Sequence, residues 1–325
     1  MPIAAVALSF LVSFALLFFL VRRLGHLGLD RPNERSLHER PVPRTGGVAV
    51  LAGVATSLAF GALELWLPMA LALLLAALSF LDDLYTLRSS WRLAGHLATA
   101  CTLVWYVLSP MYYVEMAVLV LAVAWITNLY NFMDGSDGLA GGMSVIGFAT
   151  YTFAAWLAGQ TALAVVAASI AGAAGAFLLY NAHPARIFLG DAGSIPLGFL
   201  AAALGILGWR NDAWPLWFPL VVFGPFIGDA TLTLVKRVIR GERVWRAHRD
   251  HYYQRMIRMG LGHRSTAYIE YAAMAVCAGA ALFGRQQPPG VQAAVFGAVT
   301  LGLVAIAVWV DARWARYSRD ERVTA

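Results

Sequence analysis

Long apolar runs recur along almost the whole chain, and one of them, from Gly138 to Ala182, contains no charged residue. A helix needs about 20 apolar residues to cross the roughly 30 Å hydrocarbon core of a bilayer, so this run is long enough for two crossings. Only helices and closed barrels satisfy the backbone inside a membrane. The runs are unbroken rather than alternating, which favours helices. The sequence therefore predicts an all-α integral membrane protein.

We expect a single bundle of about eleven transmembrane helices. Only 13% of the residues are charged, compared with about a quarter in soluble domains. The loops between the runs are short, so residues 1–325 are expected to form one polytopic domain, in which Gly159 and Gln160 divide the long uncharged run. The predicted spans are 2–21, 46–63, 65–81, 93–109, 114–131, 141–158, 161–180, 195–208, 213–235, 266–283 and 290–310.

The positions of the basic residues predict the orientation. With a periplasmic N-terminus and a cytoplasmic C-terminus, 22 of the 24 Lys and Arg residues lie on the cytoplasmic side, and only Arg210 and Arg285 do not. The first span has no basic residue before it and two after it, Arg22 and Arg23, which is typical of an uncleaved anchor. Because topology explains the net charge of +6, we expect anionic lipid and phosphorylated substrates as partners, and no nucleic acid.

The polar residues gather at the predicted cytoplasmic ends of the spans. Ionisable groups near a bilayer are costly and tend to be functional. We therefore expect a multi-pass protein whose active site faces the cytoplasm and is formed by loops 22–45, 82–92, 132–140, 181–194 and 236–265.

Two adjacent carboxylates, Asp82 and Asp83, end one predicted span. Two adjacent carboxylates repel each other unless they share a cation or a proton. A divalent metal, or a phosphate substrate carrying Mg²⁺, would relieve this repulsion. The alternative is a solvated helix end. Arg88 and Arg92 follow at a spacing of four and could pair with phosphate oxygens, or they could be topology signals.

The segment NLYNFMDGSDG places Asn128, Asn131, Asp134 and Asp137 at intervals of three, which predicts that they share one side of a helix end. Their oxygens are the hard ligands that Mg²⁺ prefers. The alternative is a polar turn between two spans. Further along the chain, the segment IFLGDAGS contains Asp191 just before the next predicted span. A role as the N-cap of that helix is enough to explain an aspartate at this position.

The longest and most basic loop contains AHRDHYYQR, in which His248, Arg249 and His251 could bind an anionic oxygen or sugar hydroxyls. The alternative is a basic amphipathic stretch that lies on anionic lipid. Four other histidines stand apart from any cluster, and we expect them to be structural: His26, His96, His183 and His263.

Taken in order, these segments resemble the polyprenyl-phosphate N-acetylhexosamine 1-phosphate transferases over about residues 28–265. The resemblance implies a Mg²⁺- or Mn²⁺-dependent enzyme of the bacterial inner membrane. It would transfer HexNAc 1-phosphate from UDP-GlcNAc, or from a deoxy sugar nucleotide such as UDP-FucNAc, to undecaprenyl phosphate and release UMP. That reaction is the first membrane step of O-antigen or other cell-surface polysaccharide synthesis. The resemblance also allows for a homodimer.

The resemblance implies roles for the acidic residues. Asp82 and Asp83 match the aspartate pair near the lipid phosphate, one of which is proposed as base or activator. Arg92 falls where the family commonly has a basic residue near the pyrophosphate. Asn131 and Asp191 match positions that hold Mg²⁺, so Asp191 is a candidate for both the metal site and catalysis.

The remaining candidate residues would bind the donor. Asp137 matches the residue associated with uracil recognition, and Asp134 lies in the same loop. His248, Arg249 and His251 match the late loop that contacts phosphate and sugar.

Two loops indicate the branch of the family. The first loop, with Arg44 before Gly46 and Gly47, is similar to the O-antigen branch, and Arg44 is a candidate for substrate binding. The late loop lacks the multiple histidines of the phospho-N-acetylmuramoyl-pentapeptide transferases, which disfavours that alternative. A secondary transporter is the alternative from another class, and Asp229 is the nearest candidate for its intramembrane carboxylate.

Overall fold

The computed structural model describes the chain except for residues 1, 27, 31, 33–36, 38–39, 86, 109–112, 244–247 and 325, and the side chains of residues 84 and 320–324. The α-helices are α1 (Pro2–Arg23), α2 (Gly46–Ala55), α3 (Trp66–Tyr85), α4 (Ser89–Leu108), α5 (Tyr113–Phe132), α6 (Leu139–Leu157), α7 (Thr161–Asn181), α8 (Asp191–Arg210), α9 (Trp217–Val222), α10 (Gly224–Ile239), α11 (Tyr252–Met256), α12 (Gly262–Gly284) and α13 (Pro289–Thr324).

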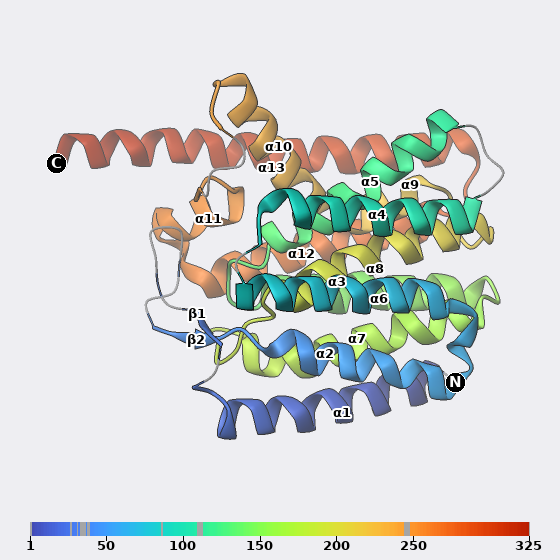
Figure 1. Cartoon of the computed structure of the whole chain (residues 1–325). Helices are drawn as coiled ribbons and strands as arrows, with labels where there is room; N and C mark the ends of the chain where they lie inside the picture. Colours follow the sequence, from blue (N-terminus) through green and yellow to red (C-terminus); the bar gives the residue numbers. More distant parts are fainter. Residues whose placement is uncertain are drawn as a thin grey trace.

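The long helices lie side by side in one bundle (Figure 1). Within the described residues, eight helical segments are long and apolar enough to cross a membrane, and each predicted span overlaps a helix. The prediction of an all-helical, multi-pass membrane protein is therefore confirmed, whereas the number of spans and the orientation stay predictions. We call the end of the bundle that carries α11 and the short strands β1 and β2 the polar end (Figure 1).

The uncharged run divides as predicted. Helix α6 ends at Leu157 and α7 begins at Thr161, and the turn between them contains Gly159 at a φ of +74°. Such a backbone conformation favours glycine because it has no Cβ. The predicted span 213–235 differs, since it is divided between α9 and α10 at Phe223. Pro225, two residues after Phe223, supplies no backbone N–H, so the α-helical hydrogen bonding is interrupted there.

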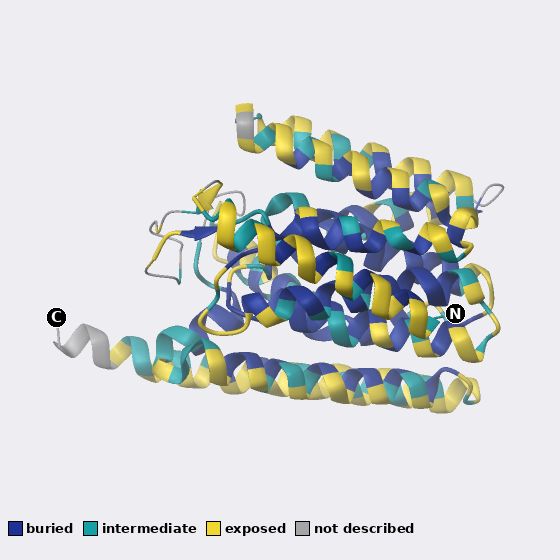
Figure 2. Ribbon diagram, turned by 90° about the horizontal axis from the view of Figure 1, so that it is seen from below, coloured by how far each residue is buried: buried dark blue, intermediate teal, exposed yellow. Residues whose placement is uncertain are grey.

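Helix α8 lies at the centre of the bundle and α13 at its edge. In the most apolar part of α8, 89% of the residues are buried, compared with 11% in α13. Figure 2 shows the buried interior of the bundle and α13 extending past it toward the C-terminus. Because α8 begins at Asp191, the first candidate residue on this helix is held by the best-packed element of the molecule.

The first loop contains the only strands of the described residues. Strands β1 (Leu29–Asp30) and β2 (Val42–Pro43) are antiparallel, with Leu29 opposite Pro43 and Asp30 opposite Val42. The loop then runs along the segment before α8, since the amide of Phe188 donates a hydrogen bond to the carbonyl of Pro43 at 2.8 Å. Two distant parts of the sequence are thereby joined at the polar end.

Candidate active site

The predicted catalytic carboxylates meet at the polar end, where two arginines join them. Arg92 Nη1 lies 2.7 Å from Asp82 Oδ2 and 3.8 Å from Asp191 Oδ2. Arg44 Nη2 lies 2.9 Å from Asp83 Oδ1. Helices α3, α4 and α8 and the first loop thus each contribute a charged group. Arg88 precedes the start of α4 at Ser89, whereas Arg92 lies within this helix.

Glycines allow the backbones of the first loop and of α8 to touch. The amides of Gly46 and Gly47 donate to the carbonyls of Phe188 and Leu189, both at 2.9 Å. A Cβ atom on Gly47 would clash with the backbone of Gly193. This close approach holds the first loop, and with it Arg44, beside the start of α8.

Asp191 is the first residue of α8 and not its N-cap. The N-cap is Gly190, whose φ of +68° favours glycine and where a Cβ would clash with the Arg44 carbonyl. This position corrects the expectation that Asp191 acts as the cap. A carboxylate in the first turn is stabilised by the partial positive charge of the helix N-terminus. The Asp191 carboxylate is thus not used as a cap and faces Arg92 at 3.8 Å.

Asn131 and Asp134 lie next to the start of α8. Ser194 Oγ, one turn after Asp191, donates to Asn131 Oδ1 at 2.8 Å. Partial burial of the Asp134 carboxyl and the negative charge of Asp191 raise the pKa of Asp134 well above its usual value. A cation bound beside these two carboxyls would favour the ionised form of Asp134.

The predicted single face of Asn128, Asn131, Asp134 and Asp137 is wrong. Helix α5 ends at Phe132, so that the two asparagines are helical and the two aspartates lie in the following loop. Asn128 Nδ2 donates to the carbonyl of Ala124 at 2.7 Å, while Asp137 binds residues of the 181–194 loop. The alternative interpretation, a polar turn between two spans, is therefore correct for the second half of the segment NLYNFMDGSDG.

Asn131, Asp134 and Asp191 fit a magnesium ion that a substrate helps to bind. Among the described residues, no three His, Cys, Asp or Glu side chains form a metal site by themselves. Mg²⁺ usually keeps several waters and takes only one or two carboxylates together with substrate phosphates. The amide oxygen of Asn131 and the neighbouring carboxyls of Asp134 and Asp191 are a donor set of that kind.

Asp137 is buried, with 6% of the residue exposed, and its carboxylate is already bound. Oδ2 lies 2.7 Å from His183 Nδ1 and accepts the amide of Ala185 at 3.1 Å. The rings of His183 and His263 stack with centroids 5.4 Å apart, and His263 Nδ1 lies 4.0 Å from Asp137 Oδ1. Sequence reasoning set both histidines apart from the site. The one available signal was that His183 falls within the 181–194 loop.

Asn181 is a second residue that sequence reasoning did not single out. Its Oδ1 accepts the amide of Gly138 at 2.9 Å, and its Nδ2 donates to the carbonyl of Ile187 at 3.0 Å. The side chain is buried. Asn181 thus fixes the loop of Asp134 and Asp137 against the segment that leads to Asp191.

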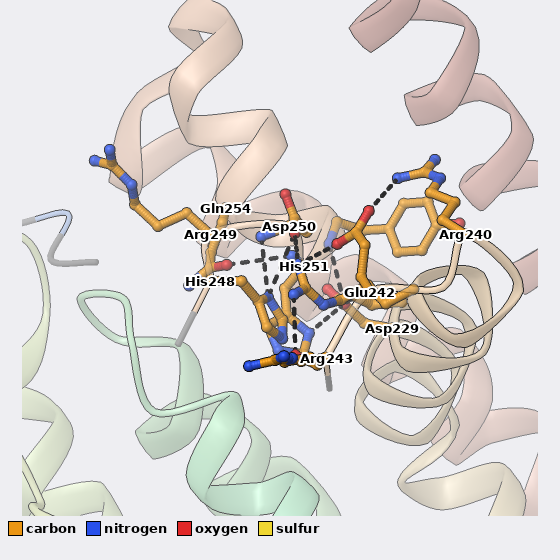
Figure 3. A network of polar contacts seen from close by, with 12 residues as sticks. Asp229, Arg240, Glu242, Arg243, His248, Arg249, Asp250, His251 and Gln254 are labelled. Atoms are coloured by element: carbon orange, nitrogen blue, oxygen red, sulfur yellow. Dashed lines mark hydrogen bonds and ion pairs between the residues drawn. The ribbon is translucent and has the colours of Figure 1, made fainter. Parts of the chain in front are cut away.

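The late loop is organised around Asp229 (Figure 3). Asp229 Oδ1 lies 3.0 Å from His251 Nδ1 and accepts the amide of Tyr252 at 3.0 Å, while Oδ2 accepts the amide of Tyr253 at 3.0 Å. His251 is 3% exposed. Asp229 and His251 therefore hold the start of α11 in place, and His251 does not lie open to solvent.

His248 and Arg249 differ from each other in charge and direction. Burial and the neighbouring His251 lower the pKa of His248 to about 4, so its imidazole is neutral at pH 7. The Arg249 side chain extends away from the network in Figure 3, and its guanidinium has no partner among the described residues. Of the three predicted late-loop residues, Arg249 is the one that offers an available positive charge.

The sequence that builds this site matches a known family. The sequence model described as glycosyl transferase family 4 matches residues 65–209. The decaprenyl-phosphate N-acetylglucosaminephosphotransferase of Mycobacterium tuberculosis (strain CDC 1551 / Oshkosh) is 30% identical over 338 residues, which cover 88% of this chain and 82% of the relative. The chain therefore belongs to glycosyl transferase family 4, and the predicted family is confirmed.

Two further relatives refine the comparison. A protein of Bacillus subtilis (strain 168) named probable undecaprenyl-phosphate N-acetylglucosaminyl 1-phosphate transferase is 28% identical over 262 residues, 75% of this chain and 73% of its own. The phospho-N-acetylmuramoyl-pentapeptide-transferase of Geobacillus sp. (strain WCH70) is 37% identical, but over 135 residues that cover 40% of each chain. The similarity to the N-acetylglucosaminyl enzymes thus extends over a much larger part of the chain.

Proposed function

We propose that the protein transfers N-acetylglucosamine 1-phosphate from UDP-GlcNAc to undecaprenyl phosphate, with release of UMP. The observation that carries this proposal is the meeting of Asp82, Asp83 and Asp191 with Arg44 and Arg92 at the polar end of a membrane bundle. Such a site can bind two phosphate-bearing substrates, one of them from the bilayer.

The relatives support the choice of sugar and lipid. Two that match most of the chain are named for N-acetylglucosamine and for undecaprenyl or decaprenyl phosphate. The product, an undecaprenyl-diphosphate sugar, would be the first membrane intermediate of O-antigen or of another cell-surface polysaccharide. We further propose that the polar end faces the cytoplasm of a bacterial inner membrane, because 22 of the 24 Lys and Arg residues follow that orientation.

Asp83 is the better candidate to orient the lipid phosphate. Asp82 accepts bonds from Arg92 at 2.7 Å and from the amide of Leu87 at 2.8 Å, and its side chain is 12% exposed. The Asp83 side chain is 27% exposed and pairs with one partner, Arg44. Asp82 is thus a fixed part of the site, while Asp83 can turn toward a substrate together with its arginine.

In the reaction, an oxygen of the lipid phosphate attacks the phosphorus that carries the sugar. A new phosphorus–oxygen bond forms, the bond from that phosphorus to the bridging oxygen of the pyrophosphate breaks, and UMP leaves with the bridging oxygen. Arg92 and Arg44 position the phosphates and offset their charge. Asn131 and Asp191, with Asp134 beside them, would hold Mg²⁺ or Mn²⁺, which supplies positive charge at the pyrophosphate.

A two-step route would pass through a phosphorylated aspartate. Incubation with UDP-GlcNAc in the absence of undecaprenyl phosphate distinguishes the routes. Direct transfer predicts no phosphorylated protein by intact-mass spectrometry, whereas a trapped sugar-phosphoryl adduct on Asp82 or Asp83 would establish the two-step route.

The proposed function is tested by UMP release from membranes that contain the protein. Undecaprenyl phosphate, Mg²⁺ and a panel of UDP-HexNAc donors that includes UDP-GlcNAc and UDP-FucNAc are supplied. We expect release with UDP-GlcNAc and its loss in Asp191→Asn, while Asp212→Asn, which alters an exposed loop residue at the opposite end, serves as matched control. Normal activity of Asp191→Asn would contradict the assigned site. Substrate-dependent ion flux in proteoliposomes without UMP release would favour a transporter.

A further inference from the structure

The last helix is attached to the late loop by contacts that the reaction described above does not use. Ala307 and Val310 of α13 form a small buried cluster with Tyr252 and Met256 of α11, separate from the main core. Helix α13 is otherwise the most exposed of the candidate spans, with 11% of its most apolar part buried. Its contact with α11 is therefore a local attachment and not part of general core packing.

One carboxylate, Asp311, completes this attachment. Its Oδ1 accepts a bond from Arg255 Nη1 of α11 at 3.0 Å, and its Oδ2 pairs with Lys236 Nζ of α10. Tyr252 Oη lies 3.3 Å from the same Oδ2 and 2.6 Å from Lys236 Nζ. Three helices, α10, α11 and α13, thus meet at a single acidic group.

The two cations depend on Asp311. The Arg255 side chain is 4% exposed. Within the described residues, Arg255 and Lys236 both pair with the same carboxylate, that of Asp311. A buried guanidinium without its carboxylate is strongly destabilising, and the two positive charges would then repel each other. Loss of Asp311 is therefore expected to displace α11 from α10.

The position of α11 determines the geometry of the late loop. Lys236 lies in the last turn of α10 and Arg255 lies in α11, on either side of His248 and Arg249 in the chain. Asp229 holds the amides of Tyr252 and Tyr253 at the start of α11. Arg249, the available cation of the loop, precedes α11 by three residues. A shift of α11 is therefore transmitted to Arg249.

We propose that Asp311 is a positioning residue that fixes the late loop through Lys236 and Arg255, so that the C-terminal helix contributes to binding of the sugar-nucleotide donor. This inference rests on the proposed function for its kinetic consequence. The structural consequence is independent of it, because it concerns the accessibility of the loop in the protein without substrate.

The test compares Asp311→Asn, Asp311→Glu and, as matched control, Glu115→Gln, which alters an exposed carboxylate at the start of α5. In purified full-length protein without substrates, we expect tryptic cleavage after Arg249 to accelerate about tenfold in Asp311→Asn. Asp311→Glu should restore part of the protection. In the UMP-release assay, the KM for the donor should rise about tenfold, with smaller changes in kcat and in the KM for undecaprenyl phosphate.

The pairing is tested by the double variant Lys236→Met with Asp311→Asn. If Asp311 acts through its ion pair with Lys236, the effects of the two substitutions on the rate of tryptic cleavage are not additive. Wild-type cleavage rates in Asp311→Asn, or equal loss of kcat for every variant with an unchanged donor KM, would overturn the inference. Absence of UMP release from the wild-type protein would refute the proposed function instead and would leave the cleavage result to decide the role of Asp311.

Discussion

The buried carboxylate of Asp229 gives the sharpest prediction, because its four hydrogen bonds are all defined. It accepts from His251 Nδ1, from the amides of Tyr252 and Tyr253, and from Thr233 Oγ1 at 3.2 Å. The Asp229→Asn change replaces one acceptor oxygen with an amide group that only donates. At least one buried donor then loses its partner, and the remaining bonds lose the assistance of the charge.

The magnitude follows from these bonds. An unsatisfied buried donor costs about 1–3 kcal/mol, and each bond that changes from a charged to a neutral acceptor loses roughly 0.5–1 kcal/mol. We therefore expect Asp229→Asn to lower the free energy of unfolding by about 3–5 kcal/mol. The exposed control Asp212→Asn should change it by less than about 0.5 kcal/mol.

Denaturant unfolding of the protein in detergent measures this difference, and hydrogen exchange locates it. The amides of Tyr252 and Tyr253 should lose protection in Asp229→Asn while those in the middle of α8 keep theirs. If the stability stays within about 0.5 kcal/mol of the wild type and both tyrosine amides remain protected, Asp229 does not organise α11 and the reasoning is refuted.

The other predictions concern pH, close packing and the arginine at the acidic cluster. Because the pKa of His248 is about 4 in the folded protein and about 6.5 in an unfolded chain, the unfolded state takes up the proton first as the pH falls. Stability should therefore decline between pH 6.5 and pH 4 in the wild type and less so in His248→Gln, as measured by thermal unfolding across this range. Gly47→Ala should clash with Gly193 and lower the free energy of unfolding by about 1–3 kcal/mol, and unchanged thermal unfolding would show that the two backbones are not in contact. Arg92→Ala should abolish most UMP release while changing stability by about 1 kcal/mol or less, since its pair with Asp82 is partly exposed, and Arg92→Lys should retain part of the activity. Equal activity of the two Arg92 variants would argue against a specific phosphate contact.

The positions of the long helices in the sequence could be predicted because the bilayer imposes a strong local requirement on the sequence. Runs of about 20 apolar residues are needed for each crossing, and turn residues such as Gly159 mark their ends. The division of α9 from α10 at Phe223 was missed, since apolar residues continue across it and Pro225 is the signal of the break. Hydropathy measures the affinity of a segment for lipid, and it does not record where the helical hydrogen bonding is interrupted.

The acidic residues of the candidate site could also be predicted, but for a different reason from the spans. Asp82, Asp83, Asn131 and Asp191 occupy ordered motifs at helix ends, and in a short-looped bundle such ends come together. The pairing of Asp137 with His183 could not be predicted in this way. The two residues lie 46 positions apart, and both sit in irregular loops whose course depends on packing against other segments.

The sequence by itself determined that this chain crosses a membrane and that the candidate site residues lie at the ends of its apolar runs, because solvation energy acts on each segment separately. Only the tertiary structure decided how those groups are used. It buried His251 against Asp229, left Arg249 available, and assigned Asp311 of the last helix to the cations of α10 and α11. These roles depend on distances between segments far apart in the chain, and no local property of the sequence specifies such distances.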